Sequence, residues 1–120
     1  MAIPALLKAR LAANESSAIS SLRSILIANE AYEIRFASYA STLTNLRTAE
    51  LLEETVAEAA ANPGKSGYLF DYQLTGSFYS INANPLNPGS SGNRHFVLDQ
   101  TGVIRYREGS PASSADTPVN

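Results

Sequence analysis

The stretch of sequence that decides the fold is PALLKARLAANESSAISSLRSILIANEAYEIRF, residues 4–36. All seven glycines, and every proline except Pro4, lie at or after position 63. Because glycine and proline interrupt helices, the residues between Pro4 and position 63 are free to form them. Pro4 itself suits the first helical turn, where its missing N–H has no partner. The sequence therefore predicts a long helix over about residues 4–37.

Apolar side chains recur along this helix at the spacing of one helical face. The stripe consists of Leu11, Ala18, Leu22, Ile25, Tyr32 and Phe36, and Ile19 and Leu26 widen it. A helix of this length is a rod of about 50 Å, which a 120-residue domain does not cover from end to end. We expect its lower part, with Leu6, Leu7 and Leu11, to project and to need a partner. A two-stranded coiled coil is an alternative, although Glu15 and Asn29 interrupt the stripe.

Residues 38–62 are expected to connect the long helix to the rest of the domain. The serine- and threonine-rich part at 38–45 is typical of a loop. One short helix should follow, with Thr48 as its N-cap and Glu50, Glu53 and Glu54 in its first turns, where negative charge suits the helix dipole. The Asn-Pro-Gly triplet at 62–64 is expected to end it.

After Lys65 the apolar period changes to two, which is typical of strands. Residues 66–107 predict two hairpins, with turns at 75–77 and 100–102, separated by a loop at 84–92 that is rich in proline and glycine. Residues 108–120 are small and polar and predict a flexible tail. The fold class is therefore α+β: one domain, residues 1–120, in which the long helix packs on a four-stranded antiparallel sheet.

A set of apolar and aromatic side chains is expected to join the helix to this sheet. They are Leu22, Ile25, Tyr32, Phe36, Tyr68, Phe70, Tyr72, Phe96, Leu98, Ile104 and Tyr106. Large aromatic side chains supply most of the apolar surface in such a core. Their spacing is accounted for by packing alone.

The composition excludes several classes of function. The net charge is −2 and the basic residues are scattered, which argues against a nucleic-acid partner. The chain has no cysteine, so disulfides, thiolate metal sites and cysteine nucleophiles are excluded. No apolar run approaches the roughly 20 residues that span a bilayer. We expect neither a nucleic-acid partner nor membrane contact from this stretch of chain.

No combination of side chains in the sequence indicates an enzyme. His95 is the only histidine, so a general base or a zinc site there would lack a second imidazole or a thiolate. The triplet GKS at 64–66 resembles the end of a phosphate-binding loop, but Ala59 stands where that loop needs glycine. The aspartates do not show the spacing of a calcium loop, and a calcium site formed by the fold stays open. We expect no catalytic activity and no cofactor.

The opening run AIPALLKARLAANE at 2–15, continued by SSAISSLRSI at 16–25, resembles the helix of bacterial type IV pilins and pseudopilins. It corresponds to the part just after that family's strongly apolar first segment. The runs KSGY at 65–68, YSINA at 79–83, RHF at 94–96 and DQTGVIRY at 99–106 look like the head sheet of one pilin-like subgroup. The family's processing site and apolar segment are absent, so the resemblance implies a truncated, soluble head domain with Met1 as an added start. The calcium loop common in major secretion pseudopilins is also absent, which favours a pilus.

The resemblance implies a structural subunit of a type IV pilus, serving motility or adhesion, that polymerises helix against helix. Its partners would be copies of itself, the inner-membrane assembly machinery, and a prepilin peptidase acting on the full-length form. It would lie in the inner membrane and then in an extracellular pilus, or in the periplasm if it is a pseudopilin of a secretion system. A soluble module whose helix docks onto one partner is the alternative from another class. Neighbouring helices would meet at Ile3, Pro4, Leu6, Leu7, Leu11, Ile19 and Leu26.

Overall fold

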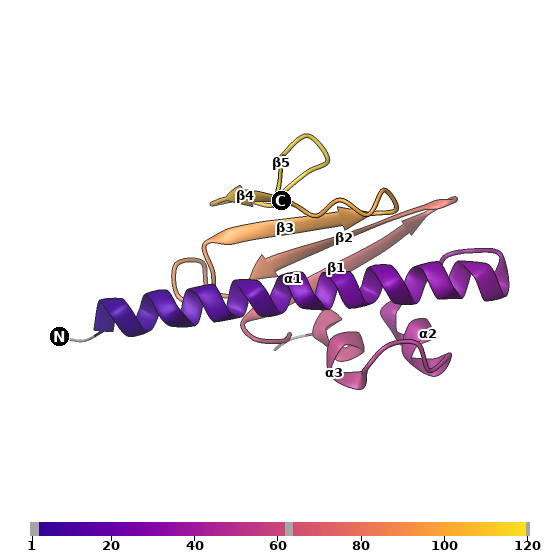
Figure 1. The fold of residues 1–120 in the computed structure, drawn as a ribbon, viewed down its shortest axis with the longest axis horizontal. Helices are drawn as coiled ribbons and strands as arrows, with labels where there is room; N and C mark the ends of the chain where they lie inside the picture. Colours follow the sequence, from indigo (N-terminus) through magenta and orange to yellow (C-terminus); the bar gives the residue numbers. More distant parts are fainter. Residues whose placement is uncertain (1–2, 62–63, 120) are drawn as a thin grey trace.

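One long helix runs the length of the computed structural model, which describes residues 3–61 and 64–119 (Figure 1). Helix α1, Ile3–Phe36, has 34 residues and lies along the longest dimension of a molecule that measures 54 × 30 × 21 Å. It ends where Ala37 takes a left-handed conformation with φ of 63°, and the Ala37 N–H donates to the Glu33 carbonyl at 2.8 Å. Both ends lie within one residue of the predicted bounds. The side chains of Ile3 and Pro4 lie outside the described part of the chain.

Five strands form a single antiparallel sheet in which each strand neighbours the next along the chain. They are β1 (Tyr68–Thr75), β2 (Phe78–Pro85), β3 (Arg94–Asp99), β4 (Arg105–Glu108) and β5 (Thr117–Pro118). The sheet lies on one side of α1, as Figure 1 shows. The α+β class with a long N-terminal helix is thus as predicted.

The fifth strand corrects the prediction of a four-stranded sheet. Strand β5 lies within residues 108–120, where we predicted a flexible tail, and it pairs with β4. Next to it the Val119 N–H donates to the Ile104 carbonyl at 2.9 Å. Further back, Ala112 is buried and its carbonyl accepts a hydrogen bond from Asn82 Nδ2 at 3.0 Å. Arg107 of β4 also pairs with Asp116, just before β5, with Nη2 3.0 Å from Oδ1. The prediction of a flexible tail followed its small polar composition, which does not show these partners.

Strand β2 is longer than predicted because Asn84 and Pro85, assigned to a loop, continue it. They pair with Leu69 and Tyr68 of β1, whereas the pairing of β2 with β3 ends at Ala83. Proline lacks a backbone N–H and is tolerated where one side of a strand is unpaired. The predicted loop at 84–92 therefore begins two residues later.

Two short helices replace the single helix predicted in the connection. Helix α2 spans Leu43–Thr48, and α3, Glu54–Ala57, runs on into a 3-10 turn, η1, at Glu58–Ala60. The N-cap is Thr42, whose hydroxyl accepts from the Asn45 N–H at 3.2 Å, and Thr48 is the last helical residue. Both threonines are good caps, and the burial of Leu43 and Leu46 selects the earlier one.

The glutamates predicted for one helical turn are instead divided between the two helices. Glu50 has a φ of 63° and lies in the turn after α2, while Glu53 and Glu54 are the N-cap and first residue of α3. Asn62 and Pro63, expected to end the predicted helix, lie outside the described residues.

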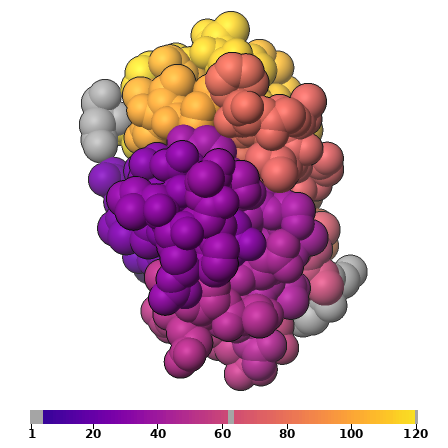
Figure 2. Space-filling view, turned by 90° about the vertical axis from the view of Figure 1, so that its right-hand side faces the viewer, coloured from indigo at the N-terminus to yellow at the C-terminus, as the bar shows by residue number. Residues whose placement is uncertain are grey.

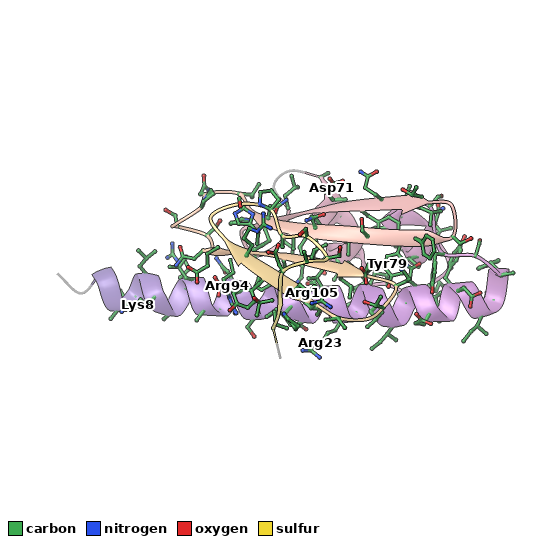
Figure 3. The ribbon with its side chains drawn as sticks, turned by 90° about the horizontal axis from the view of Figure 1, so that it is seen from above. Lys8, Arg23, Asp71, Tyr79, Arg94 and Arg105 are labelled. Carbon is green, nitrogen blue, oxygen red and sulfur yellow. The ribbon has the colours of Figure 1, made fainter. Side chains whose placement is uncertain are left out.

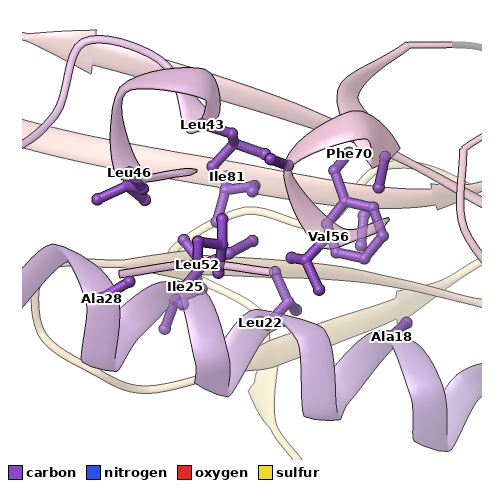
Figure 4. Close-up of a cluster of buried hydrophobic side chains, with 14 of the residues drawn as sticks. Ala18, Leu22, Ile25, Ala28, Leu43, Leu46, Leu52, Val56, Phe70 and Ile81 are labelled. Atoms are coloured by element: carbon purple, nitrogen blue, oxygen red, sulfur yellow. The ribbon is translucent and has the colours of Figure 1, made fainter. Parts of the chain in front are cut away.

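The core lies between α1, the sheet and the two short helices (Figure 4). Leu22 and Ile25 of α1 are fully buried, as are Leu46 of α2 and Ile81 of β2. Among the side chains assigned to the core, Leu22, Ile25, Tyr68, Phe70, Phe96, Leu98 and Ile104 are buried, and Tyr32, Tyr72 and Tyr106 pack partly buried against them.

Phe36 is the exception among the predicted core residues, since 50% of its surface is exposed. The chain reverses immediately after it, at Ala37, so the sheet does not cover the last helical turn. Its ring stays in contact with Tyr32, with ring centroids 4.5 Å apart. The assignment of Phe36 to the core was wrong because periodicity does not show where a covering sheet ends.

Candidate functional site

The amino end of α1 extends past the rest of the molecule as an uncovered segment (Figure 1). Residues 5–10 are all exposed, with 68% of Leu6 and 36% of Leu7 accessible, and Leu11 is half-buried. Among the described residues of α1, Asn14 is the first that hydrogen-bonds to another element. We call residues 5–13 the projecting segment. The structure places Leu6 and Leu7 within it and Leu11 at its border with the head.

A cluster of polar contacts joins the head to α1 directly after the projecting segment, at Asn14 and Glu15. The carboxylate of Glu15 accepts from the Asn93 N–H at 3.1 Å, from the Arg94 N–H at 3.0 Å and from Arg94 Nε at 3.1 Å. Asn14 Nδ2 donates to the Ser91 carbonyl at 2.9 Å. Glu15, which interrupts the apolar stripe in the sequence, therefore holds the loop before β3 against the helix.

Asn29, the other interruption of the stripe, joins α1 to the connection and to β1. Its side chain is fully buried; Nδ2 donates to the Tyr72 hydroxyl at 2.8 Å and Oδ1 accepts from the Ala40 N–H at 3.0 Å. The Tyr72 hydroxyl in turn donates to the Ala40 carbonyl at 2.6 Å. Burial raises the pKa of Tyr72, so its hydroxyl stays protonated as this donor. Both polar residues that interrupt the stripe, Glu15 and Asn29, thus have hydrogen-bond partners that hold other parts of the fold against α1.

A second apolar row lies on the side of α1 that faces away from the sheet. Its members recur every seven residues and are all exposed: Leu6, Ala13, Ser20, Ile27 and Ile34. Ile27 is 69% and Ile34 82% exposed. Seven residues are nearly two helical turns, so these side chains form one row that turns around the helix by about 20° per heptad, which we call the outer row. Figure 2, seen from the end of the molecule where α1 finishes, shows α1 at the surface between the sheet above and the connection below.

Sequence reasoning missed Ile27 and Ile34 because it followed the stripe that faces the sheet. The signal that could have found them is a spacing of seven: Ile27 and Ile34 are seven positions apart, and they lie 21 and 28 positions after Leu6. Conversely, Ile19 and Leu26, predicted to meet neighbouring helices, pack against the chain's own core. Leu26 also lines a groove of about 230 Å³ beside Val103 and Val119. Ile19 and Leu26 are both half-buried, so the head covers part of each side chain, and their contact with neighbouring helices stays a prediction.

Charged side chains are distributed unequally along α1. The projecting segment carries Lys8 and Arg10 and no acidic residue, whereas Glu30 and Glu33 lie near Ile27 and Ile34. Ion pairs within the described ranges join other side chains: Arg47 with Glu54, Arg94 with Glu15, and Arg107 with Asp116. Burial, together with the charges of Glu30 and Glu33, raises the pKa of Tyr39.

The residues considered for catalysis serve structural contacts. His95 is buried in β3, with Nδ1 2.8 Å from Asn84 Oδ1. Its Nε2 has no hydrogen-bond partner among the described atoms. Burial lowers the pKa of the His95 side chain. Lys65 Nζ donates to the Ser17 hydroxyl at 2.9 Å. Over residues 3–61 and 64–119, no group of three or more histidine, aspartate or glutamate side chains is placed to hold a metal ion. The surface of α1 remains as the candidate functional site.

Comparisons with protein-family models, with curated proteins and with solved structures found no match. Within the part of the chain that the structure describes, no helix is both long and apolar enough to cross a membrane. The exposed surface of α1 is therefore the feature of this chain that points to a function.

Proposed function

We propose that this chain is the head domain of a type IV pilin-like filament subunit that polymerises through α1. One observation carries the proposal: α1 exposes large apolar side chains at both of its ends, Leu6 and Leu7 in the projecting segment and Ile27 and Ile34 in the outer row. Burying a leucine or isoleucine side chain stabilises a contact by roughly 1.5–3 kcal/mol. A second copy of the chain supplies the apolar surface that makes this burial possible.

The positions of these side chains favour an open polymer over a closed dimer. The projecting segment and the region of Ile27 and Ile34 are different surfaces at opposite ends of one helix. When the first surface of one copy meets the second surface of the next, the contact does not close, and its repetition generates a helical filament. Few side chains take part in each contact, so we expect this chain alone to be a monomer at micromolar concentration.

The resemblance of residues 2–25 to the pilin helix supports the same proposal. In that setting the full-length protein would be held in the inner membrane, cleaved by a prepilin peptidase and added to an extracellular pilus. A further apolar helical segment in the full-length protein would then supply most of the filament core. The head would face outward and serve adhesion or motility.

Electron microscopy of cells that make the full-length protein tests the proposal. We expect long surface fibres, and we expect Ile27→Lys and Ile34→Lys to reduce them strongly, because each lysine puts a charge into an apolar contact. Phe78→Lys is a matched control, since Phe78 is 62% exposed but belongs to the start of β2 and not to α1. Circular dichroism of each variant checks that the head still folds.

Three outcomes would count against a pilus subunit. Short periplasmic fibres would assign the protein to a secretion system as a pseudopilin. Surface fibres that are unaffected by both helix variants would show that the outer row is not the assembly surface. A native gene that encodes no apolar segment with a peptidase site ahead of Ala2 would favour the helix-docking module.

A further inference from the structure

We propose that the projecting segment of one copy lies parallel to α1 of the next copy, on the outer row at residues 26–36, with a displacement of three heptads. The inference rests on the proposed function and adds the register, the orientation and the charged contacts of the assembly surface. It follows from two features of α1, the spacing of the outer row and the distribution of charge.

The spacing of the outer row determines the register. Leu6 and Ile27 are 21 positions apart, and so are Ala13 and Ile34. Because 21 residues are three heptads, the two stretches of the row differ in direction by about 60° on a straight helix, and a left-handed supercoil of parallel helices removes this difference. Leu6 then lies against Ile27 of the next copy, and the small Ala13 lies against the large Ile34. At 1.5 Å per residue the displacement is about 32 Å.

The rest of the molecule leaves room for this neighbour. The sheet covers the opposite side of α1, and the outer row is exposed along its length. Figure 3 shows Lys8 on the part of the helix that extends past the sheet, and Arg23 pointing away from the sheet. A second helix can therefore approach the outer row without meeting the sheet of this copy.

Charge favours the parallel orientation. When the two copies are displaced by 21 residues, Arg10 of one copy lies at the same height along the axis as residue 31 of the next. Glu30 is one residue from that height and Glu33 is two residues from it. From the helical angle of 100° per residue, Arg10 lies on one side of the outer row and Glu30 on the other. Opposite sides of the row meet across a parallel pair of helices, so the guanidinium faces the carboxylates. Arg10 and Glu30 are exposed, and the ion pairs of the described chain leave both available.

An antiparallel pair of helices centred on Ser20 would bring the same apolar side chains together, but its charged side chains would be less complementary than in the parallel pair. Leu6 would meet Ile34 and Ala13 would meet Ile27, but equal sides of the row would then face each other. Arg10 would lie on the side of Arg35, whose Nη1 already donates to the Ala49 carbonyl at 3.3 Å. Arg23 also belongs to α1, but it lies outside residues 26–36, the part that the projecting segment contacts in the parallel pair. Like charges across the row disfavour the antiparallel pair.

Because the chain has no cysteine, disulfide cross-linking of single-cysteine variants reads the register directly. Leu6→Cys, Ala13→Cys, Ile27→Cys and Ile34→Cys are mixed in pairs at high protein concentration under oxidising conditions. We expect disulfides for 6 with 27 and for 13 with 34. The pairs 6 with 34 and 13 with 27 are displaced by seven residues, about 10 Å along the axis, which exceeds the reach of a disulfide. These mismatched pairs are the control for random collision.

Charge reversal tests the orientation. Arg10→Glu, in the copy that carries Leu6→Cys, should lower its cross-linking to Ile27→Cys about fivefold, and Glu30→Arg in the other copy should restore it. Lys8→Glu is the matched control, because Lys8 lies nearly opposite Leu6 around the helix and should not alter the yield.

Three results would overturn the register. They are disulfides for 6 with 34 and 13 with 27, equal or absent disulfides in all four pairs, and a cross-linking yield that Arg10→Glu does not change. Fibres in micrographs together with any of these results would leave the filament proposal intact. The absence of fibres would overturn the proposed function itself.

Discussion

One carboxylate, Glu15, attaches the head to the lower part of α1, and its removal should loosen that attachment while leaving the core intact. Its side chain is 14% exposed and accepts hydrogen bonds from two backbone N–H groups, those of Asn93 and Arg94, and from Arg94 Nε. Glu15→Ala leaves all three donors without this acceptor. The bond from Asn14 Nδ2 to the Ser91 carbonyl then remains to hold the loop before β3.

The expected loss follows from these contacts. A hydrogen bond to a charged group contributes about 1.5–3 kcal/mol, and the three bonds to one carboxylate are not additive because the loosened loop lets water reach the donors. The Arg94 side chain is 31% exposed, so solvent screens part of the ion pair. We expect Glu15→Ala to lower the free energy of unfolding by about 2–3 kcal/mol. Glu15→Gln keeps an oxygen for the backbone donors and should lose about 1 kcal/mol.

Urea unfolding followed by circular dichroism measures both losses, and hydrogen exchange at the Arg94 amide localises them. Glu30→Ala is the matched control, because Glu30 is an exposed glutamate of the same helix and should change stability by less than about 0.5 kcal/mol. If Glu15→Ala lowers stability no more than this control, or if the Arg94 amide stays equally protected, then Glu15 does not anchor the head.

Two further predictions concern buried polar groups. Tyr79→Phe should leave stability unchanged or raise it by up to about 1 kcal/mol, because the buried Tyr79 hydroxyl has no partner among the described atoms; Tyr72→Phe should lower it by about 1–2 kcal/mol, because that hydroxyl makes two hydrogen bonds. Thermal unfolding of the two variants compares them, and a greater loss in the Tyr79 variant would contradict the assignment. Burial lowers the pKa of His95, so the folded state binds a proton less readily than the unfolded chain; stability should decline as pH falls below about 6.5 and be fully present above it. Urea midpoints at about pH 7.5 and about pH 5 should differ less in His95→Gln than in the parent chain, and an equal difference would exclude His95 as the cause.

Local physical chemistry explains which parts of the fold were predictable. The absence of glycine and proline after Pro4 and the spacing of Leu22 and Ile25 determine a helix and its buried face, because both act through nearby residues. The alternation of apolar residues after Lys65 determines strands for the same reason. The choice of Thr42 over Thr48 as a helix cap depended instead on which leucines reach the core.

Contacts between residues far apart in the chain were not predictable. Glu15 and Asn29 interrupt an apolar pattern in the sequence, and their partners, Arg94 and Tyr72, lie 79 and 43 positions away. Strand β5 forms through its backbone pairing with β4 and beside the ion pair of Asp116 with Arg107, and the composition of the tail shows neither. In each case the partner exists only once the sheet is in place.

The order of the residues is enough to specify a helix too long for its domain, with apolar residues on more than one side. Which side is covered depends on the packing of the sheet, because the sheet can lie on one side of a helix alone. It buries Leu22 and Ile25 and leaves Ile27 and Ile34 to solvent. Periodicity shows that a row of side chains shares a direction, and the surface against which that row packs is set by the rest of the chain or by another molecule.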